Sequence, residues 1–222
     1  MKLSFAAFAL ASAQGTVEEI QFLNGEDRSY TLSEANFQSL KFLVGLHFKI
    51  KGLNDFDHNK YFRYGCHCFI MNGDDIFERG QGRPVDALDN KCKAYKDCRR
   101  CVREKHAEEC APSPWLGIVD GNIVLEEAAP GSCERDLFEC DYQFAKGIFA
   151  ERDTFNEEFH HLQSTIGFNR EEDTFCSSNG GSSSDHQCCG GFDAPWRWIN
   201  LSNNKCCMNG ESGVVVGADD QC

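Results

Sequence analysis

Fourteen cysteines in a chain of 222 residues constrain the fold more than any other feature of this sequence. Their even number suits complete pairing into disulfide bonds in an oxidising compartment. Hydrophobic residues make up 41% of the chain and the mean hydropathy is −0.47, so crosslinks must supplement a thin apolar core. Each bridge is worth roughly 2–4 kcal/mol against a total stability of about 5–15 kcal/mol. The sequence therefore predicts a disulfide-rich fold that does not survive the loss of one or two bridges.

The first thirteen residues have the pattern of a secretory signal peptide. Lys2 supplies a positive charge, Leu3–Leu10 is a short apolar stretch, and Ala11–Ala13 is a small-residue cleavage site. A buried first helix is the alternative interpretation. The stretch is too short to span a bilayer, which needs about 20 apolar residues, and no later run comes close. We expect residues 1–13 to be removed and the mature chain, beginning near Gln14, to be secreted and extracellular, with no transmembrane segment.

The chain is strongly acidic, with a formal net charge of −13. That charge argues against nucleic acid as a partner, because affinity for nucleic acid comes from neutralising its phosphates. It also argues against adsorption to anionic membranes. The charge serves solubility alone or, alternatively, attracts calcium or mineral surfaces. The sequence does not identify the partner, and extracellular matrix, mineral and other secreted proteins remain as classes.

Three segments combine helical apolar spacing with helix-start signals, over residues 31–51, 86–109 and 133–166. Thr31 and Glu34 form a capping box at the first of them. Asp86 or Asp89 supplies a carboxylate cap for the second. The third is the longest and carries one apolar stripe along its length. The sequence therefore predicts a mainly α-helical core of three helices.

A β-hairpin is predicted between the second and third helices. Asp120-Gly121 separates two runs that are rich in β-branched residues, and this is a strong hairpin signal. No internal repeat is present. The hairpin would form a small wing beside the helices.

The composition changes after Glu172. A Ser/Gly-rich linker is followed by two vicinal cysteine pairs, Cys188-Cys189 and Cys206-Cys207. Asn200 begins the only N-glycosylation sequon, Asn-Leu-Ser. The predicted organisation is a signal peptide, a helical domain and a small Cys-rich C-terminal module, over residues 1–13, 14–172 and 173–222.

Two blocks of residues carry a resemblance to a known family. The first is Tyr64-Gly65-Cys66-His67-Cys68, and the second runs from Gly80 to Cys98 with the order Gly-x-Gly-x-Pro-x-Asp near its start. Cys140-Asp141 followed by Ala145 forms a third, weaker block. Together they resemble the secreted phospholipase A2 signature, over roughly residues 35–150. The resemblance implies a disulfide-rich core of three helices with a small β-hairpin wing, to which this chain adds its Cys-rich module.

The resemblance also implies where a reaction centre would lie. In the family a histidine activates water, an aspartate on the last helix orients that histidine, and a second aspartate with loop carbonyls holds calcium. Here Tyr95 stands in place of the histidine and Lys96 in place of the calcium-binding aspartate, while Asp141 matches the orienting aspartate. A phenol with a pKa near 10 is a poor base at neutral pH. We expect the Tyr95 hydroxyl to donate to Asp141 and its ring to fill the space of an imidazole.

No cofactor is predicted, because Lys96 removes a carboxylate ligand and adds an ammonium that repels calcium. A short insertion after Cys68 is nevertheless acidic and contains Asn72, Gly73, Asp74, Asp75 and Glu78. We expect residues 72–78 to form a solvated loop, with a relocated cation site as the alternative. The predicted catalytic and metal residues are therefore none.

Other groups do not replace the lost histidine. The sequence has four further candidates, His67, His106, His160 and His161. No aspartate follows any of them in the frame of the signature, so we expect surface or structural histidines. Cys98 and Cys101 are only half of a zinc-ribbon pattern, and disulfides are the expected state.

The resemblance further implies two disulfide pairs, Cys68–Cys92 and Cys98–Cys140. It also implies that Cys66 is joined to a C-terminal cysteine, which the sequence does not identify. Lys91 stands where the family has another cysteine, so one family bridge must be missing or rerouted.

These observations predict a secreted, catalytically inactive phospholipase A2-like protein that acts as an extracellular binding or structural component. An active calcium-dependent phospholipase A2-type lipid hydrolase is the first alternative. A membrane-active, toxin-like homologue is the second. The acidic charge and the loss of the histidine both argue against that last class.

Overall fold

The structure is a computed structural model that describes residues 18–21, 31–76, 78, 80–107, 110–113, 115–177, 185–192 and 194–222, with residues 18–21 as backbone alone. The predicted signal peptide and nearly all of the predicted Ser/Gly linker lie outside the described residues. No helix in the described ranges is both long enough and apolar enough to cross a membrane.

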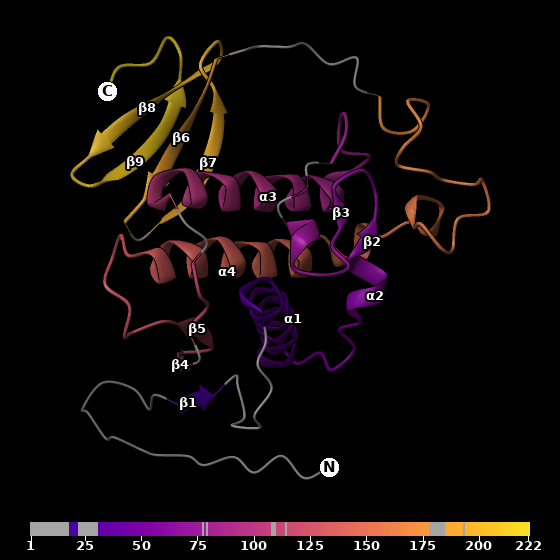
Figure 1. The fold of residues 1–222 in the computed structure, drawn as a ribbon, viewed down its shortest axis with the longest axis horizontal. Helices are drawn as coiled ribbons and strands as arrows, with labels where there is room; N and C mark the ends of the chain where they lie inside the picture. The colour runs from indigo at the N-terminus through magenta and orange to yellow at the C-terminus, as the bar shows by residue number, and fades with distance from the viewer. Residues whose placement is uncertain are drawn as a thin grey trace.

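Three long helices form the core, α1 (Leu32–Ile50), α3 (Ala87–His106) and α4 (Cys133–Glu151). Each begins at a side chain that accepts a free backbone N–H: Thr31 in a complete capping box, Asp86, and Ser132. In Figure 1, α3 and α4 lie side by side and α1 packs against α4. An ion pair between the start of α3 and the end of α4, Lys91 with Glu151 at 3.4 Å, shows that these two helices are antiparallel.

The last helix is shorter than the apolar stripe predicted. It ends at Glu151, and residues 152–166 form two short 3-10 helices, Arg152–Thr154 and Glu157–Phe159, and turns. The apolar side chains beyond Glu151 pack on another segment instead. The rings of Phe155 and Phe159 lie 5.1 and 6.4 Å from that of Tyr64. The predicted helix to residue 166 was therefore wrong, because tertiary packing replaced the helical repeat.

The predicted wing is present as strands β4 (Trp115–Val119) and β5 (Asn122–Val124), which pair antiparallel. Asp120 and Gly121 turn between them with φ of 49° and 71°, as a tight hairpin turn requires. A third strand, β1 (Glu18–Gln21), pairs with β4, so the sheet order is β1-β4-β5. Strand β1 thus adds a third strand to the wing.

Short elements form the loop between α1 and α3. They are α2 (His58–Tyr61), β2 (Arg63–Tyr64), β3 (Cys68–Phe69) and a 3-10 turn, η1 (Asp74–Ile76). Strands β2 and β3 pair antiparallel around Gly65–His67. This small hairpin contains the first block of the family resemblance and leads toward the glycine–proline turn before α3.

The interior between the helices is rich in aromatic side chains. The largest fully buried side chains include Phe48, Phe62, Tyr64, Leu40, Leu43, Leu88, Leu137 and Ile148. Phe62 contacts the rings of Phe37 and Phe144, which come from α1 and α4, with ring centroids 6.3 and 5.9 Å apart. The sequence stripes of α1 and α4 therefore meet at one aromatic core.

Seven disulfide bonds use all fourteen cysteines. They join Cys66–Cys176, Cys68–Cys92, Cys98–Cys140, Cys101–Cys188, Cys110–Cys133, Cys189–Cys206 and Cys207–Cys222. Cys68–Cys92 and Cys98–Cys140 are the two pairs that the resemblance implied. Cys176 is the C-terminal partner of Cys66, and the cysteine position taken by Lys91 holds the ion pair with Glu151 instead.

Four C-terminal strands form two hairpins, β6 (His186–Gly191) with β7 (Ala194–Asn200) and β8 (Asn204–Asn209) with β9 (Ser212–Gly217). In this group of strands, at the yellow end of the chain in Figure 1, β7 lies along α3 and also contacts α4. Their anchors are the Cys101–Cys188 bridge and two stacked cations, Arg100 over Trp198 at 3.8 Å and Lys105 over Trp196 at 4.9 Å.

Candidate functional site

The residues predicted to stand at a former reaction centre do meet in the structure. Tyr95 and Asp141 face each other from the antiparallel helices α3 and α4, and both are buried. The Tyr95 ring stacks on Phe144 with centroids 4.5 Å apart and planes 26° apart. The space between the two helices is thereby filled by aromatic surface.

A buried ion pair, which sequence reasoning missed, occupies the centre. Arg99 Nη1 lies 3.4 Å from Asp141 Oδ1, and each side chain is only 3% exposed. Arg99 follows Tyr95 by four residues, and this spacing places both side chains on one face of α3. This spacing is the sequence signal that could have identified Arg99 as part of the centre. Burial raises the pKa of the Asp141 carboxyl to about 6, while the Arg99 guanidinium acts in the opposite direction.

The Tyr95 hydroxyl lies beside the Asp141 carboxylate, as expected, and also beside the Arg99 guanidinium. It is buried, and its hydrogen bond to Asp141 does not have the normal geometry. Burial raises the pKa of this phenol well above its ordinary value, and the nearby Asp141 carboxylate raises it further. Arg99 is the charged partner of Asp141. A guanidinium satisfies a buried carboxylate better than a neutral phenol does.

Lys96 is buried beside the β2–β3 hairpin. Its Nζ donates to the carbonyl oxygen of Phe69 at 3.0 Å, and its side chain does not swing out to solvent. Burial, together with the smaller effect of Arg170, lowers the pKa of Lys96 to about 8.

These residues do not fit a calcium ion of the kind that the family resemblance implies. Calcium takes 6–8 oxygen ligands, carboxylates among them. Here an ammonium group is already bonded to the Phe69 carbonyl, and no carboxylate stands at the position of Lys96. A lysine cation therefore satisfies the loop oxygen in this chain.

The acidic insertion uses its carboxylates to fold itself. Asp75 accepts the backbone N–H groups of Met71 and Asn72 at 2.6 and 3.1 Å. Asp74 accepts the Ser33 hydroxyl at 2.8 Å, and Glu78 lies 3.7 Å from Arg170. Within the described ranges, no three His, Cys, Asp or Glu side chains form a cluster that could hold a metal ion.

Asp89 holds the loop in front of α3. Its carboxylate accepts three backbone N–H groups, from Cys66 at 2.9 Å, His67 at 2.7 Å and Val85 at 3.0 Å. Burial raises the pKa of Asp89 to about 6, although the three N–H groups lower it. A Cβ on Gly65 would lie 2.4 Å from the Asp89 carboxyl carbon. This position therefore requires glycine.

The histidines are structural. The His67 ring donates from Nε2 to the Gly82 carbonyl at 3.2 Å, and burial lowers its pKa to about 4. His160 and His161 are likewise bonded to backbone carbonyls, and both follow the shortened α4 rather than lying on it. His106 lies 2.9 Å from Asp136. None of the four lies in the Tyr95–Asp141 centre.

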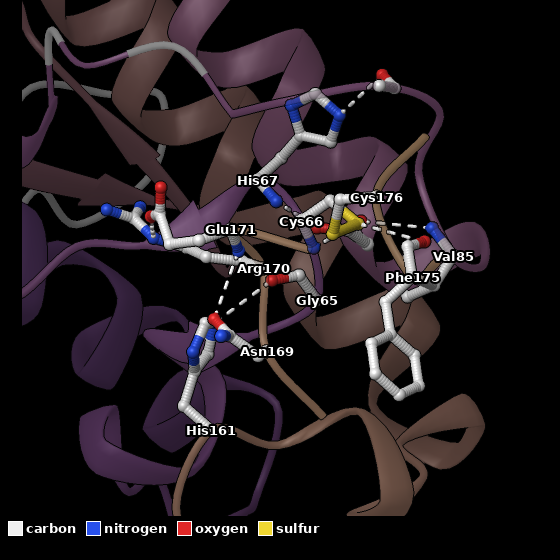
Figure 2. The surroundings of a disulfide bond; sticks show 12 residues. Gly65, Cys66, His67, Val85, His161, Asn169, Arg170, Glu171, Phe175 and Cys176 are labelled. Carbon is white, nitrogen blue, oxygen red and sulfur yellow. Dashed lines mark hydrogen bonds and ion pairs between the residues drawn. A yellow bond between two sulfur atoms is a disulfide. The ribbon is translucent and has the colours of Figure 1, made fainter. Parts of the chain in front are cut away.

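Residues 152–177, which we call the strap, pass over the β2–β3 hairpin. Figure 2 shows the far end of the strap, where Cys176 is bonded to Cys66 and His161 points at Gly65. The Arg170 guanidinium lies 3.9 Å above the Phe69 ring. The strap therefore covers the loop that would face a metal ion.

Two hollows are lined by described residues, and the smaller of them reaches the centre. A polar hollow of about 270 Å³ lies between the strap and the glycine turn, lined by Cys66, Glu78, Gly80, Gln81, Arg170 and Glu171. A second space, which touches Asp141, measures about 10 Å³. That volume suits a single water molecule at most and has no room for a lipid chain.

Comparisons with known proteins agree with this geometry. The family model described as Phospholipase A2 matches residues 43–160. The chain is 30% identical over 109 residues to the basic phospholipase A2 homolog LmutTX of Lachesis muta muta, which is 46% of this chain and 76% of that protein. It is 30% identical to the basic phospholipase A2 homolog MjTX-I of Bothrops moojeni, over 45% of this chain and 63% of that protein. It is 34% identical to the basic phospholipase A2 beta-bungarotoxin A-AL3 chain of Bungarus multicinctus, over 37% and 54%.

Proposed function

The chain belongs to the phospholipase A2 family, and from that premise we propose that it is a secreted, catalytically inactive member that acts as an extracellular binding or structural component. The observation that carries the proposal is the buried Arg99–Asp141 ion pair beside Tyr95. The carboxylate that would orient a catalytic base is bound to a cation instead. No imidazole stands next to it in the described chain.

General-base catalysis has no suitable group at this centre. A base works best when its pKa lies near the working pH, and both burial and Asp141 move the pKa of Tyr95 away from that range. Tyr95 is also packed face to face on Phe144. The Tyr95 side chain is therefore part of the hydrophobic core.

Charge stabilisation by a metal is also disfavoured. Lys96 Nζ is bonded to the Phe69 carbonyl, and an ammonium repels a divalent ion. The space that touches Asp141 is too small for a lipid chain. Bringing a phospholipid to Asp141 through this space would require rearrangement of the core.

Secretion is supported by the seven disulfide bonds, because such bonds persist in oxidising compartments. It is also supported by the signal-peptide pattern of residues 1–13. We further propose glycosylation at Asn200, whose side-chain oxygen accepts the Ser202 N–H at 2.8 Å in a turn after β7. The net charge of −13 contrasts with the relatives named basic and favours cationic, mineral or matrix partners over nucleic acid.

A phospholipid hydrolysis assay tests the proposal. Purified protein, with native disulfides, is incubated with a fluorogenic phospholipid in millimolar calcium or in chelator, next to an active secreted phospholipase A2. We expect no chelator-sensitive turnover. The double substitution Tyr95→His with Lys96→Asp is expected to remain inactive as well, because Arg99 still holds Asp141. Chelator-sensitive turnover by the unmodified protein would overturn the proposal.

A second candidate, membrane disruption, is favoured by one observation, the lysine bonded to the loop carbonyl in a chain whose relatives include proteins named phospholipase A2 homologs. Release of a dye from liposomes separates the two candidates. We expect no release from liposomes of anionic lipid, because the chain is acidic.

A further inference from the structure

Two adjacent histidines attach the strap to the loops beneath it. His160 Nε2 lies 3.0 Å from the Asn59 carbonyl, and His161 Nε2 lies 3.1 Å from the Gly65 carbonyl. Figure 2 shows the second of these contacts. A carbonyl oxygen only accepts, so both rings must carry their proton on Nε2.

The second nitrogen of His160 is also used. Nδ1 lies 3.1 Å from the backbone nitrogen of Leu162, whose N–H can only donate. The ring therefore has one donor and one acceptor nitrogen, which is the neutral form. A protonated imidazole has two donors. Its Nδ1–H would oppose the Leu162 N–H inside a site where His160 is 2% exposed.

Backbone bonds make the histidines part of one latch. The Gly65 N–H donates to the Phe159 carbonyl at 2.8 Å, and the His161 N–H donates to the Arg63 carbonyl at 3.0 Å. Residues 159–161 thus extend the β2–β3 hairpin as an additional edge. The His161 ring also packs on Phe69 and Phe168, each at 5.3 Å.

The charged groups around His160 and His161 do not favour a positive charge on either ring. The charged groups around it are Lys60 from α2, Arg63 from β2, Lys96 from α3, and Glu158, Arg170 and Glu171 from the strap. Four of these are cationic and two are anionic. Burial lowers the pKa of His161, and Arg170 and His160 lower it further, against the effect of the Gly65 bond.

We propose that the strap is an acid-sensitive latch, closed by the neutral rings of His160 and His161 and released when they take up protons. The Cys66–Cys176 bond keeps the far end attached, so the released segment swings between that bond and the end of α4. Release exposes an aromatic cluster on the inner side of the strap itself, in which Phe168 is buried and Phe159 and Phe175 pack against it.

The direction of the pH effect follows from linkage. A histidine whose folded pKa is lowered contributes stability above its ordinary pKa near 6.5, and that contribution is lost as the pH falls. Because the pKa of His161 is lowered, lowering the pH from 7.5 to 5.0 therefore favours the open strap, by at most about 30-fold through this ring. The opening of the long helices does not depend on whether His160 and His161 are protonated.

Hydrogen exchange of the full-length, disulfide-intact protein tests the latch. We expect the protection of peptides covering 157–168 to fall, by up to about 30-fold, between pH 7.5 and 5.0, after correction for intrinsic exchange. Peptides from α1 and α3 should show the same pH dependence with and without the two histidines. The double substitution His160→Gln with His161→Gln retains an amide donor near each carbonyl and cannot be protonated, so its strap should show no such fall. His186→Gln, an exposed position on β6, is the matched control and should behave like the unmodified chain.

Two results would overturn the latch: unchanged strap protection at pH 5.0 in the unmodified protein, or the same fall in the double variant. If the double variant does not fold, nitrogen spectra of the histidine rings in the unmodified protein decide the matter. A His160 ring that is neutral with its proton on Nε2 while the strap is closed supports the latch. A protonated His160 ring with strap protection intact contradicts it.

Discussion

The Tyr95–Asp141 centre and the strap region bury polar groups in opposite ways. Between α3 and α4 the polar groups are charges that neutralise each other, Arg99 with Asp141. Beneath the strap they are Asp89 and neutral imidazoles that satisfy backbone N–H and carbonyl groups. The first arrangement involves only side chains, so sequence change can replace it. The second holds the main chain itself and therefore keeps the shape of the family loop independent of the residues at the centre.

The largest expected effect comes from splitting the ion pair. Asp141→Ala leaves Arg99 buried without its carboxylate, and this should lower the free energy of unfolding by about 3–5 kcal/mol. Urea denaturation followed by circular dichroism measures it. Replacing both partners, Arg99→Met with Asp141→Leu, should be neutral or stabilising by about 1–4 kcal/mol. A double variant as unstable as the single one would show that the pair is not replaceable and would break the comparison.

The next effect is the pH dependence due to His67. Its pKa is lowered to about 4 by burial, so its contribution is complete above the ordinary pKa near 6.5 and is lost as the pH falls toward 4. The stability of the unmodified protein relative to His67→Gln should therefore fall by up to about 1.4 kcal/mol per pH unit in that window. The difference between the two proteins isolates His67, because Asp89 and Asp141, whose pKa values are raised, act with the opposite sign in both. Parallel pH profiles would contradict the assignment.

A smaller effect tests how closely the strap approaches the glycine turn. Gly82 has φ of +67°, and an added Cβ would lie 2.3 Å from the Ser177 carbonyl oxygen. Gly210 has a similar φ of +65° with nothing within 4 Å of an added Cβ. Gly210→Ala should cost about 1–2 kcal/mol from backbone conformation alone, and Gly82→Ala should cost more. Equal losses in thermal or urea unfolding would show that the strap is not seated on this turn.

The smallest effect concerns the position of the missing family cysteine. Lys91 pairs with Glu151 at 3.4 Å, and both side chains are partly exposed, at 36% and 25%. Lys91→Ala should therefore change the free energy of unfolding by less than about 1 kcal/mol, and the change should shrink in high salt. A loss comparable to that of Asp141→Ala would show that the lost bridge has a strong substitute here.

Much of the architecture was predictable because its signals are local. The Thr31 capping box, the Asp86 cap and the Asp120-Gly121 turn each involve residues that lie close together in sequence. The end of α4 was not predictable in this way. The apolar stripe continues past Glu151, and only the contact of Phe155 with the Tyr64 ring shows that the chain has left the helix.

The candidate site shows the same division between local sequence signals and contacts that form only when the helices pack. Tyr95 and Lys96 were found from the frame of the glycine–proline block, and Asp141 from the Cys140-Asp141 block. The carbonyl that Lys96 contacts was not predicted, nor was Arg99 as the partner of Asp141. Arg99 was overlooked although it lies one helical turn after Tyr95, because a basic residue on a charged helix indicates a solvent face far more often than a buried pair.

By itself the sequence determined the cysteine-rich class, the helix starts, the hairpin turn and the family frame, since these depend on composition and on neighbours a few residues apart. Only the tertiary structure decided that Asp141 takes Arg99, that Cys66 reaches Cys176 and that the strap covers the loop. These pairings join residues 42 to 110 positions apart. No local period or propensity records such contacts, because they form only when the helices pack.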